Sequence, residues 1–476
     1  MFITITFVAT SSVVINAEAD DNARTNSRGM YTYDYWGQVM ASAPAYTLSR
    51  ELSYLDLGLN NTSQFVAMDY YNDHLYIVDT GLNAVHIVDY DFNLIKTINE
   101  FNNEGISDSF KNPKGISVDL EGAIYIADSG NSRIVKFNSD YSLNMIITKP
   151  EHLALEELTF VPIDISTSYN GRIYVIGENV YYGIMELNGE GEFLRFVGTN
   201  QVKIPFLELF YRKIMSVEQR DYASLILPQE FRSVAVDEKG FIYATSYTKE
   251  SPVKRINING DDILVKNWFF EPVGDVDKGT QRSEFNAVSA NDHGIYAVLD
   301  RTAGRIFVYN VDGEMLYMFG GIQRQDNYFL QPVDIKWMKD DDIAVVDAKK
   351  SSIILFQATE FGQVVNKAAR YHYSGLYEEA LEYWELARKY NGNYDLAYVG
   401  IGKSYLYTEQ YKLAMKYFKL GHNRKYYSAA FSKHSTQFMR DNFIYIVLGI
   451  TLVIGASFTP KIVLNIKRRK RGESNE

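Results

Sequence analysis

The 476-residue chain contains no cysteine. This absence excludes disulfides, thiolate metal sites, cysteine nucleophiles and lipid attachment through cysteine. Positive charge is also scarce, because 48 Lys and Arg stand against 59 Asp and Glu and give a formal net charge of −11. Nucleic-acid-binding modules usually carry a basic face, so we expect no nucleic-acid partner. With 46% hydrophobic and 22% charged residues, the chain is long enough to form more than one packed domain.

Both ends of the chain carry apolar runs. Residues 1–15 form a short apolar stretch, and Ala17 and Ala19 follow with the spacing of a signal-peptidase site, although no Lys or Arg precedes the run. We expect a signal peptide at 1–19 and a linker at 20–44. Residues 443–466 can span a bilayer.

A dense basic run follows this apolar segment. Five consecutive basic residues, 467–471, begin the tail 467–476 and favour its placement in the cytoplasm. The domains before the span would then be extracytoplasmic, in a single-pass membrane protein. The alternative interpretation is a buried core helix with a solvated basic tail.

A strand-like segment recurs six times. The copies are Leu75–Asp79, Ile124–Asp128, Ile173–Gly177, Ile242–Ser246, Ile295–Asp300 and Ile343–Asp347. Their starts lie 48 to 53 residues apart, except for 69 residues between the third and fourth. Four short strands per repeat of this length are typical of a propeller blade. The sequence therefore predicts an all-β six-bladed propeller over 45–358, in which 45–52 supplies the fourth strand of the last blade.

The wide third spacing predicts a helical insertion at about 200–228. Phe206, Phe210, Ile214 and Val217 recur there at helical spacing. Two interpretations stay open, a helix packed on the propeller and a lid or partner-docking element.

The second repeat, residues 110–137 (FKNPKGISVDLEGAIYIADSGNSRIVKF), resembles an NHL repeat. This resemblance implies an NHL-type six-bladed propeller. The likeness weakens in the third and fourth repeats, where Gly177 and Ser246 replace the aspartate that ends the strand elsewhere.

The polar hexapeptide Asp128–Arg133 is either a ligand site or a turn. Asp300 and Arg305 repeat its acid-to-base spacing, whereas Asp79 and Asp347 keep only the acid. Such variation favours a turn. We expect Asp128 to accept hydrogen bonds from the turn backbone and Gly130 and Asn131 to supply its special dihedral angles.

The residue pattern becomes helical over 361–440. A pattern of Gly375, Tyr377, Ala380, Trp384 and Ala387 is followed 34 residues later by Glu409, Tyr411, Ala414, Phe418 and Gly421. This period resembles two tandem tetratricopeptide repeats. Such helices could dock a peptide or a neighbouring protein, or they could form a rigid spacer before the membrane.

Catalytic motifs are missing from the sequence. The seven histidines occupy no repeated inner-strand position, and no nucleophile elbow, phosphate loop or zinc-protease motif is present. We therefore assign no catalytic, cofactor-binding or metal-binding residues and expect no cofactor.

The repeat register gives a candidate ligand site. Counting back nine residues from each Ile-Tyr-type strand reaches the innermost strand and predicts a ring at one channel mouth, formed by Val66, Gly115, Asp164, Ser233, Asn286 and Asp334. Lys114, Arg232 and Gln331 could reach the same rim. The predicted ligand-binding residues are Asp164, Asp334, Asn286, Ser233, Arg232, Lys114 and Gln331; the alternative is that they only bind channel water. Acids, amides and bases beside aromatics suit a saccharide or a peptide.

The order signal, NHL propeller, tetratricopeptide repeats and membrane segment resembles a family of bacterial surface proteins. Members often accompany carbohydrate ABC transporters, and some continue into a multi-span Yip-like domain, whereas this sequence shows one span. The resemblance implies a non-enzymatic, membrane-anchored, extracytoplasmic binding or scaffolding protein accessory to carbohydrate uptake or sensing. Its expected partners are the membrane, a transporter or surface protein, and a saccharide. The alternative is a propeller lactonase, hydrolase or lyase acting on a sugar-derived metabolite at the channel mouth.

Overall fold

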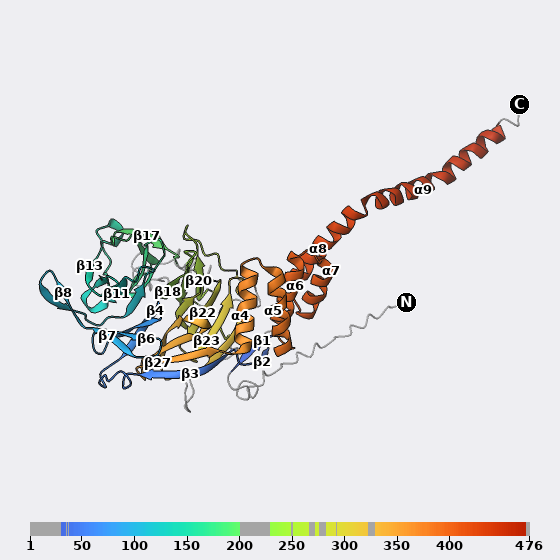
Figure 1. Cartoon of the computed structure of the whole chain (residues 1–476). Coiled ribbons are helices and arrows are strands. Elements are labelled where there is room, and N and C mark those ends of the chain that lie inside the picture. The colour runs from blue at the N-terminus through green and yellow to red at the C-terminus, as the bar shows by residue number, and fades with distance from the viewer. Residues whose placement is uncertain are drawn as a thin grey trace, which may run out of the picture.

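The computed structural model describes residues 30–34, 36, 38–199, 229–248, 251–265, 272–275, 282–291, 293–321 and 329–472. Six antiparallel sheets are arranged around a central channel and form a six-bladed propeller (Figure 1). Helices follow the last blade in sequence and pack beside it. The predicted insertion at 200–228 lies outside the described residues. The predicted fold class is therefore confirmed.

The blades run from the innermost strand outward. The strands of blades 1 to 3 are β4 (Phe65–Tyr71), β5 (His74–Asp79), β6 (Ala84–Asp89) and β7 (Leu94–Ile98); β10 (Gly115–Val118), β11 (Ile124–Asp128), β12 (Arg133–Phe137) and β13 (Leu143–Ile147); and β14 (Pro162–Thr167), β15 (Ile173–Gly177), β16 (Ile184–Leu187) and β17 (Phe193–Val197).

The remaining blades follow the same order. Their described strands are β18 (Phe231–Val236), β19 (Ile242–Ser246) and β20 (Val253–Ile256) in blade 4; β21 (Phe285–Ala290), β22 (Ile295–Asp300), β23 (Arg305–Asn310) and β24 (Met315–Gly320) in blade 5; and β25 (Pro332–Trp337), β26 (Ile343–Asp347), β27 (Ser352–Ala358) and β3 (Tyr46–Ser53) in blade 6.

The ring closes through the N-terminal strand β3. It pairs antiparallel with β27 from Ser352 opposite Ser53 to Ala358 opposite Tyr46. This pairing supplies the fourth strand of blade 6 and covers an edge that would otherwise leave backbone groups unpaired. The predicted closure by 45–52 is confirmed.

Two hairpins project from the ring. One, β1 (Tyr31–Tyr33) with β2 (Val39–Ala41), lies inside the range 20–44 that the sequence suggests is a linker. Its Tyr31 and Tyr33 hydroxyls donate to Asp275, which also pairs with Arg305 of blade 5. The other hairpin, β8 (Glu100–Asn103) with β9 (Ile106–Ser109), connects blades 1 and 2. The first segment is therefore ordered by hydrogen bonds to Asp275, which Arg305 of blade 5 holds, and hydrophobic periodicity does not reveal these bonds.

Six helices follow the propeller within the described chain. They are α4 (Glu360–Tyr373), α5 (Tyr377–Tyr390), α6 (Asp395–Tyr407), α7 (Tyr411–Leu420), α8 (Arg424–Asp441) and α9 (Phe443–Gly472). Successive helices from α4 to α8 pack on one another. The glycines of α6 permit close packing, because a Cβ on Gly400 would lie 2.4 Å from the Trp384 ring and one on Gly402 would lie 2.6 Å from the Phe418 ring. Small residues opposite large rings therefore explain the 34-residue pattern.

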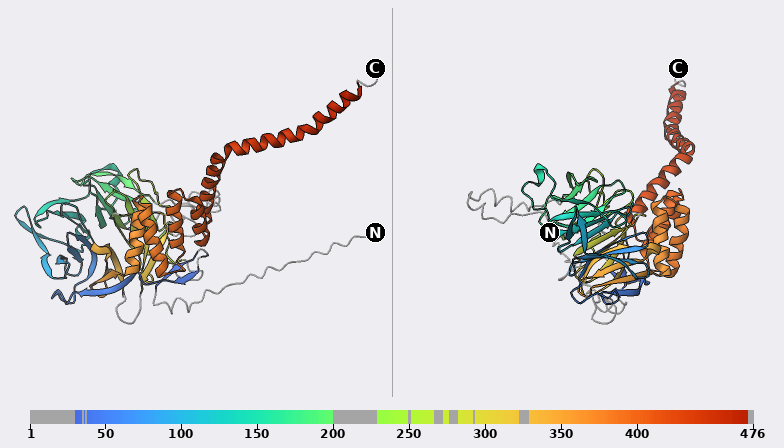
Figure 2. Two further views of the ribbon diagram at one scale, coloured as in Figure 1. Left: turned by 45° about the vertical axis from the view of Figure 1, so that its right-hand side comes forward. Right: turned by 60° about the vertical axis from the view of Figure 1, so that its left-hand side comes forward.

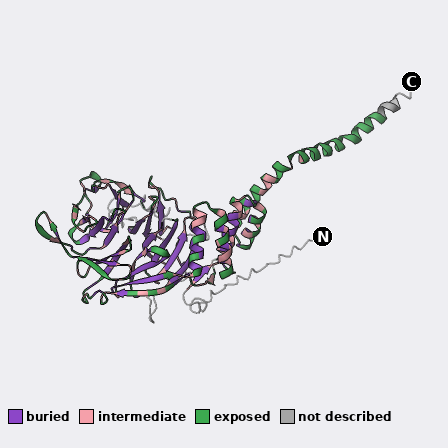
Figure 3. Cartoon of the chain, viewed as in Figure 1, coloured by how far each residue is buried: buried purple, intermediate pink, exposed green. Residues whose placement is uncertain are grey.

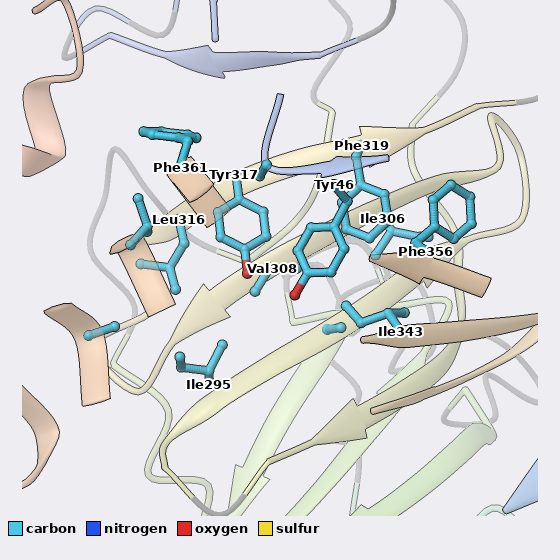
Figure 4. Close-up of a cluster of buried hydrophobic side chains, with 14 of the residues drawn as sticks. Tyr46, Ile295, Ile306, Val308, Leu316, Tyr317, Phe319, Ile343, Phe356 and Phe361 are labelled. Carbon is cyan, nitrogen blue, oxygen red and sulfur yellow. The ribbon is translucent and has the colours of Figure 1, made fainter. Parts of the chain in front are cut away.

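The helices and the propeller share one hydrophobic core. Tyr46 of β3 stacks on Phe319 of β24, and Phe361 of α4 lies in the same buried cluster (Figure 4). The Tyr317 hydroxyl donates to Asn366 of α4 at 2.5 Å, and the Tyr394 hydroxyl donates to the Leu316 carbonyl at 2.5 Å. Apolar burial together with these hydrogen bonds fixes α4 and the start of α6 against blades 5 and 6.

A buried ion pair adds a second attachment. The Lys403 ammonium of α6 lies 2.8 Å from Asp312 and 2.9 Å from Glu314, both in the β23–β24 hairpin. Burial lowers the pKa of Lys403, but the two carboxylates outweigh it and hold the pKa above its usual range. Since α4 and α6 face the propeller, their propeller-facing surfaces are already occupied, which favours the spacer interpretation of the helices over peptide docking on that side.

The last helix, α9, leaves the bundle. Its segment Phe443–Lys467 spans 25 residues, reaches a mean hydropathy of 2.0 over 18 consecutive residues, and is long and apolar enough to cross a membrane. None of it is buried within the protein, and its surface is exposed along its length (Figure 3). This exposure disfavours the alternative of a core helix.

Candidate functional site

The aspartates that end the second strand of a blade are buried and hold a neighbouring loop by hydrogen bonds. Asp79, Asp128, Asp300 and Asp347 are at most 1% exposed. Each accepts a backbone N–H from the loop that enters the innermost strand of its own blade; the donors are Gln64 at 2.8 Å, Lys111 at 2.7 Å, Glu284 at 2.9 Å and Gln331 at 3.1 Å. The polar hexapeptide is therefore a structural turn and not a binding site.

The dihedral angles of this turn differ from the prediction. Ser132 adopts the left-handed conformation, with a φ of 55°, while Gly130 and Asn131 do not. Gly130 is needed for a different reason, because a Cβ there would lie 2.5 Å from the Lys111 carbonyl oxygen. The close approach of two loops, and not a positive φ, selects the glycine.

Arg133 ties the turn to the β8–β9 hairpin. Its Nε donates to Asp128 at 2.8 Å, and its two terminal nitrogens donate to Asp108 at 2.7 and 2.8 Å. Hydrogen bonding to Arg133 lowers the pKa of Asp108 to about 2. Such a bidentate pair between a guanidinium and a carboxylate requires a specific geometry, and here it holds the β8–β9 hairpin against blade 2.

The innermost strands present side chains to the channel in successive layers. The first layer contains the residue of each innermost strand that pairs with the last but one residue of the second strand. These residues are Ala67, Gly115, Asp164, Ser233, Ala287 and Asp334. The nine-residue count is correct for four blades and wrong by one residue in blades 1 and 5. In blades 1 and 5 the Ile-Tyr-type segment starts only eight residues after Ala67 and Ala287, so the count reaches Val66 and Asn286, the extra residues of β-bulges that blades 3, 4 and 6 also have.

A closed ring of hydrogen bonds joins neighbouring blades. In every blade, one channel-layer side chain accepts the backbone N–H of the next innermost strand. The acceptor-to-donor pairs are Asp69 to Val118, Ser117 to Thr167, Asp164 to Val234, Ser233 to Val288, Ser289 to Trp337 and Asp334 to Met68, at 2.7 to 3.3 Å. Where the first-layer residue is Ala or Gly, the side chain two positions further along the same strand accepts the hydrogen bond. Asp164, Ser233 and Asp334 thus have a structural task.

Two of these acceptors, Asp164 and Asp334, have pKa values above the ordinary value for an aspartate. Burial raises the pKa of Asp164 to about 7, and the charge of Asp334 adds to the shift. Burial also raises the pKa of Asp334 to about 6, although two backbone N–H groups and Lys336 oppose it. Asp69, in contrast, has a cation beside it, because Lys336 Nζ lies 2.8 Å from its Oδ1. The channel therefore holds three carboxylates and one ammonium group.

The other predicted residues engage protein partners at the rim. Lys114 lies 3.5 Å from Glu178, and Arg232 lies 3.6 Å from Glu230 with its guanidinium over Tyr247. The Asn286 amide donates to the Pro332 and Val333 carbonyls. Gln331 is held through its backbone by Asp347. The structure brings Asp164, Ser233 and Asp334 into the channel wall and leaves the others around its entrance.

The large cavity lies at the opposite mouth. It has a volume of about 710 Å³ and is formed by the ends of the innermost strands and the turns that follow them. Its lining includes Asp69, Ser117, Asp119, Thr167, Asp237, Asn291, Lys336 and Asp340, and none of the seven predicted residues. Ligand binding by those seven stays a prediction. Continuing the register two and four residues further along the innermost strands of blades 2, 3, 4 and 6 would have found the lining of those blades.

Helix α4 overhangs this cavity. Gln363, Lys367 and Arg370, spaced along one face of α4, complete the lining, and Arg370 pairs with Asp341. Tyr169 stands at the rim with 61% of its surface exposed. The α4 residues reach the site only because the helical domain packs beside blade 6. Among the described residues, no group of three or more His, Asp or Glu side chains is arranged to hold a metal ion.

Comparisons with known proteins agree with the repeat assignment. An NHL-repeat family model matches residues 110–137. No curated protein matches the chain.

Several solved structures are similar to this chain at low identity. Virginiamycin B lyase from Staphylococcus aureus is 12% identical with a TM-score of 0.42, over 66% of this chain and 100% of that chain. A Bacteroides thetaiotaomicron protein of unknown function is 10% identical with a TM-score of 0.43, over 68% and 80%. A chain of a nidogen/laminin complex is 14% identical with a TM-score of 0.38, over 59% and 88%.

Proposed function

We propose that the chain is a membrane-anchored binding protein whose cavity takes a small polyhydroxylated ligand such as a saccharide. The observation that carries this proposal is the 710 Å³ cavity lined by carboxylate, ammonium, hydroxyl and amide groups. A site that recognises a hydroxyl-rich ligand needs donors and acceptors from several directions, and six strand ends provide them. Tyr169 at the rim offers an exposed aromatic face for stacking on a sugar ring.

The anchoring part of the proposal rests on α9. A 25-residue apolar helix exceeds the roughly 20 residues needed to cross a bilayer. We infer that α9 spans a bacterial cell membrane once, that the propeller is extracytoplasmic after a signal peptide, and that α4 to α8 form tetratricopeptide-like repeats between them. An accessory role beside a carbohydrate transporter follows from the resemblance of this domain order.

A binding experiment compares the two channel mouths. Purified chain in detergent is titrated by calorimetry with a panel of mono- and oligosaccharides, and the best ligand is then tested on two double variants. We expect Tyr169→Ala with Lys367→Ala to weaken binding at least tenfold, since both residues border the cavity. Lys114→Ala with Gln331→Ala, at the opposite entrance, serves as the matched control.

Each outcome has a distinct meaning. Loss of binding in the control pair alone would place the ligand at the entrance predicted from the sequence. Absence of binding to every saccharide would overturn the proposed ligand class. Conversion of the ligand, detected by mass spectrometry after prolonged incubation, would favour the alternative of a lactonase, hydrolase or lyase over a binding protein.

A further inference from the structure

Helices α7 and α8 carry a charge distribution unlike the rest of the chain. Residues 411–440 contain seven Lys and Arg and no Asp or Glu, in a protein of formal net charge −11. All seven basic side chains are exposed; they are Lys412, Lys416, Lys419, Arg424, Lys425, Lys433 and Arg440. A run of this length without an acid creates a locally positive surface that favours an anionic partner.

The same surface exposes large apolar side chains. Phe431, Phe438 and Met439 of α8 are 53%, 57% and 60% exposed. Phe431 and Phe438 are two helical turns apart and share a face, and Arg424 lies a further two turns back. Exposed aromatics combined with Lys and Arg are typical of helices that lie in a lipid interface.

The position of α8 brings this surface close to the membrane candidate. Helix α8 ends at Asp441, and α9 begins at Phe443. Asn442 between them has a φ of −108° and a ψ of 12°, outside helical values, so the chain bends there (Figure 2). A groove of about 400 Å³ lies between the start of α7 and the end of α8 and includes Lys412, His434 and Phe438, with Glu409 and Asp441 at its edges.

We propose that α7 and α8 lie against an anionic lipid surface, with the basic side chains at the headgroups and the exposed aromatics at the acyl boundary. This inference rests on the proposed membrane anchoring by α9. The bend at Asn442 is what permits it, because α8 can then run along the bilayer while α9 crosses it. The contact holds the propeller at a fixed orientation to the bilayer.

The length of α8 distinguishes a helix that lies along the membrane from one that stands upright on it. Helix α8 has 18 residues and is about 27 Å long. Electrostatic attraction fades over a Debye length of about 8 Å, so an upright α8 would leave Arg424 and Lys425 outside the field of the headgroups. A recumbent α8 brings them within it, and each basic residue there strengthens the contact roughly fivefold.

Fluorescence quenching in nanodiscs tests this arrangement. Because the chain has no cysteine, a single introduced cysteine can be labelled cleanly. The full chain carrying Ser428→Cys on α8 is labelled with an environment-sensitive dye and placed in phosphocholine nanodiscs with or without a phosphoglycerol lipid. We expect headgroup quenchers to quench the dye only with the anionic lipid, and high salt to reverse the quenching.

Charge variants provide the matched control. Lys419→Glu, Arg424→Glu and Lys433→Glu together should abolish the quenching, a loss of roughly a hundredfold or more in surface affinity. The same charge change on the propeller, through Lys111→Glu, Lys149→Glu and Lys349→Glu, should leave it intact. Equal quenching in both lipids, or none in either, would overturn the proposal.

A second label separates this inference from the anchoring. Ala456→Cys on α9 is exposed and reports insertion through quenchers at the bilayer centre. If the Ala456→Cys dye is quenched and the Ser428→Cys dye is not, the anchor stands and the surface contact is wrong. If the Ala456→Cys dye is not quenched, both proposals fail.

Discussion

The acid–base behaviour of the channel gives a prediction that can be worked from the structure. Asp164 has a pKa of about 7 against an ordinary value of 3.8, because burial and the nearby charge of Asp334 disfavour its ionised form. A raised pKa means that the folded state binds the proton more tightly than the unfolded state. This tighter proton binding contributes fully to the free energy of unfolding below about pH 4, and the contribution is lost as the pH rises through about 7.

The proposed substitution is Asp164→Ser. Ser233 occupies the same channel layer in the next blade and accepts the N–H of Val288 at 3.3 Å, so a serine can do this structural task. The substitution removes the ionisable group and keeps an acceptor for Val234. A pKa unit corresponds to about 1.4 kcal/mol. Since solvent in the channel screens the charge, we expect a gain of about 2 kcal/mol in the free energy of unfolding at pH 8 and little change at pH 4.5.

Thermal unfolding of the full chain in detergent, followed by tryptophan fluorescence at both pH values, measures this effect. A gain of about 2 kcal/mol raises the Tm by about 2 °C for a protein of this size. Asp69→Ser is the matched control, because Asp69 accepts the equivalent hydrogen bond but pairs with Lys336 at 2.8 Å. Removing Asp69 leaves Lys336 without its nearest counter-ion and should lower stability by about 2 kcal/mol at both pH values. An unchanged pH dependence in Asp164→Ser would refute the assignment of the titrating group.

Three further substitutions test how the domains are built. Lys403→Met leaves Asp312 and Glu314 without their cation, so we expect a loss of about 3 kcal/mol at pH 8 and a smaller loss at pH 5, measured by urea unfolding. Gly402→Val forces a side chain onto the Phe418 ring and should destabilise the helices by about 2 kcal/mol, whereas Gly392→Ala, with nothing within 4 Å of its added Cβ, should not; circular dichroism at 222 nm compares them. Asp128→Ala removes the acceptor of the Lys111 N–H and should speed hydrogen exchange at that amide, while the Lys114 amide, bonded to the Ala127 carbonyl, serves as the internal reference.

The number of blades and their closure were predictable from sequence. The Ile-Tyr-type strands recur with polar turns between them, and both strand propensity and turn chemistry act over a few residues. The fourth strand of blade 6 was predicted because the last repeat lacks one and the segment before the first repeat could pair with it. The helical period of 34 residues is local in the same sense, since Ala380 and Trp384 lie one turn apart on the buried face of α5, and Ala414 and Phe418 do so on α7.

The channel register could be predicted only in part. A fixed count assumes the same separation between the channel layer and the start of the Ile-Tyr-type segment in every blade, and this separation is one residue shorter in blades 1 and 5. The sequence does not show this separation, because the register of the two strands is set by the turn that joins them. The prediction therefore reached Asp164, Ser233 and Asp334 in the correct layer and missed Ala67 and Ala287.

The sequence by itself determined six blades, a closing N-terminal strand, a helical segment and an apolar last helix, because each depends on residue periodicity over a short range. Only the tertiary structure decided that a cavity of about 710 Å³ lies at the mouth where the innermost strands end, and that Gln363, Lys367 and Arg370 of α4 border it. That placement depends on contacts between residues about ninety or more positions apart, such as Tyr46 with Phe319 within the propeller and Lys403 with Asp312 across the domain boundary. Packing of this kind follows from shape and buried charge, which no local pattern encodes.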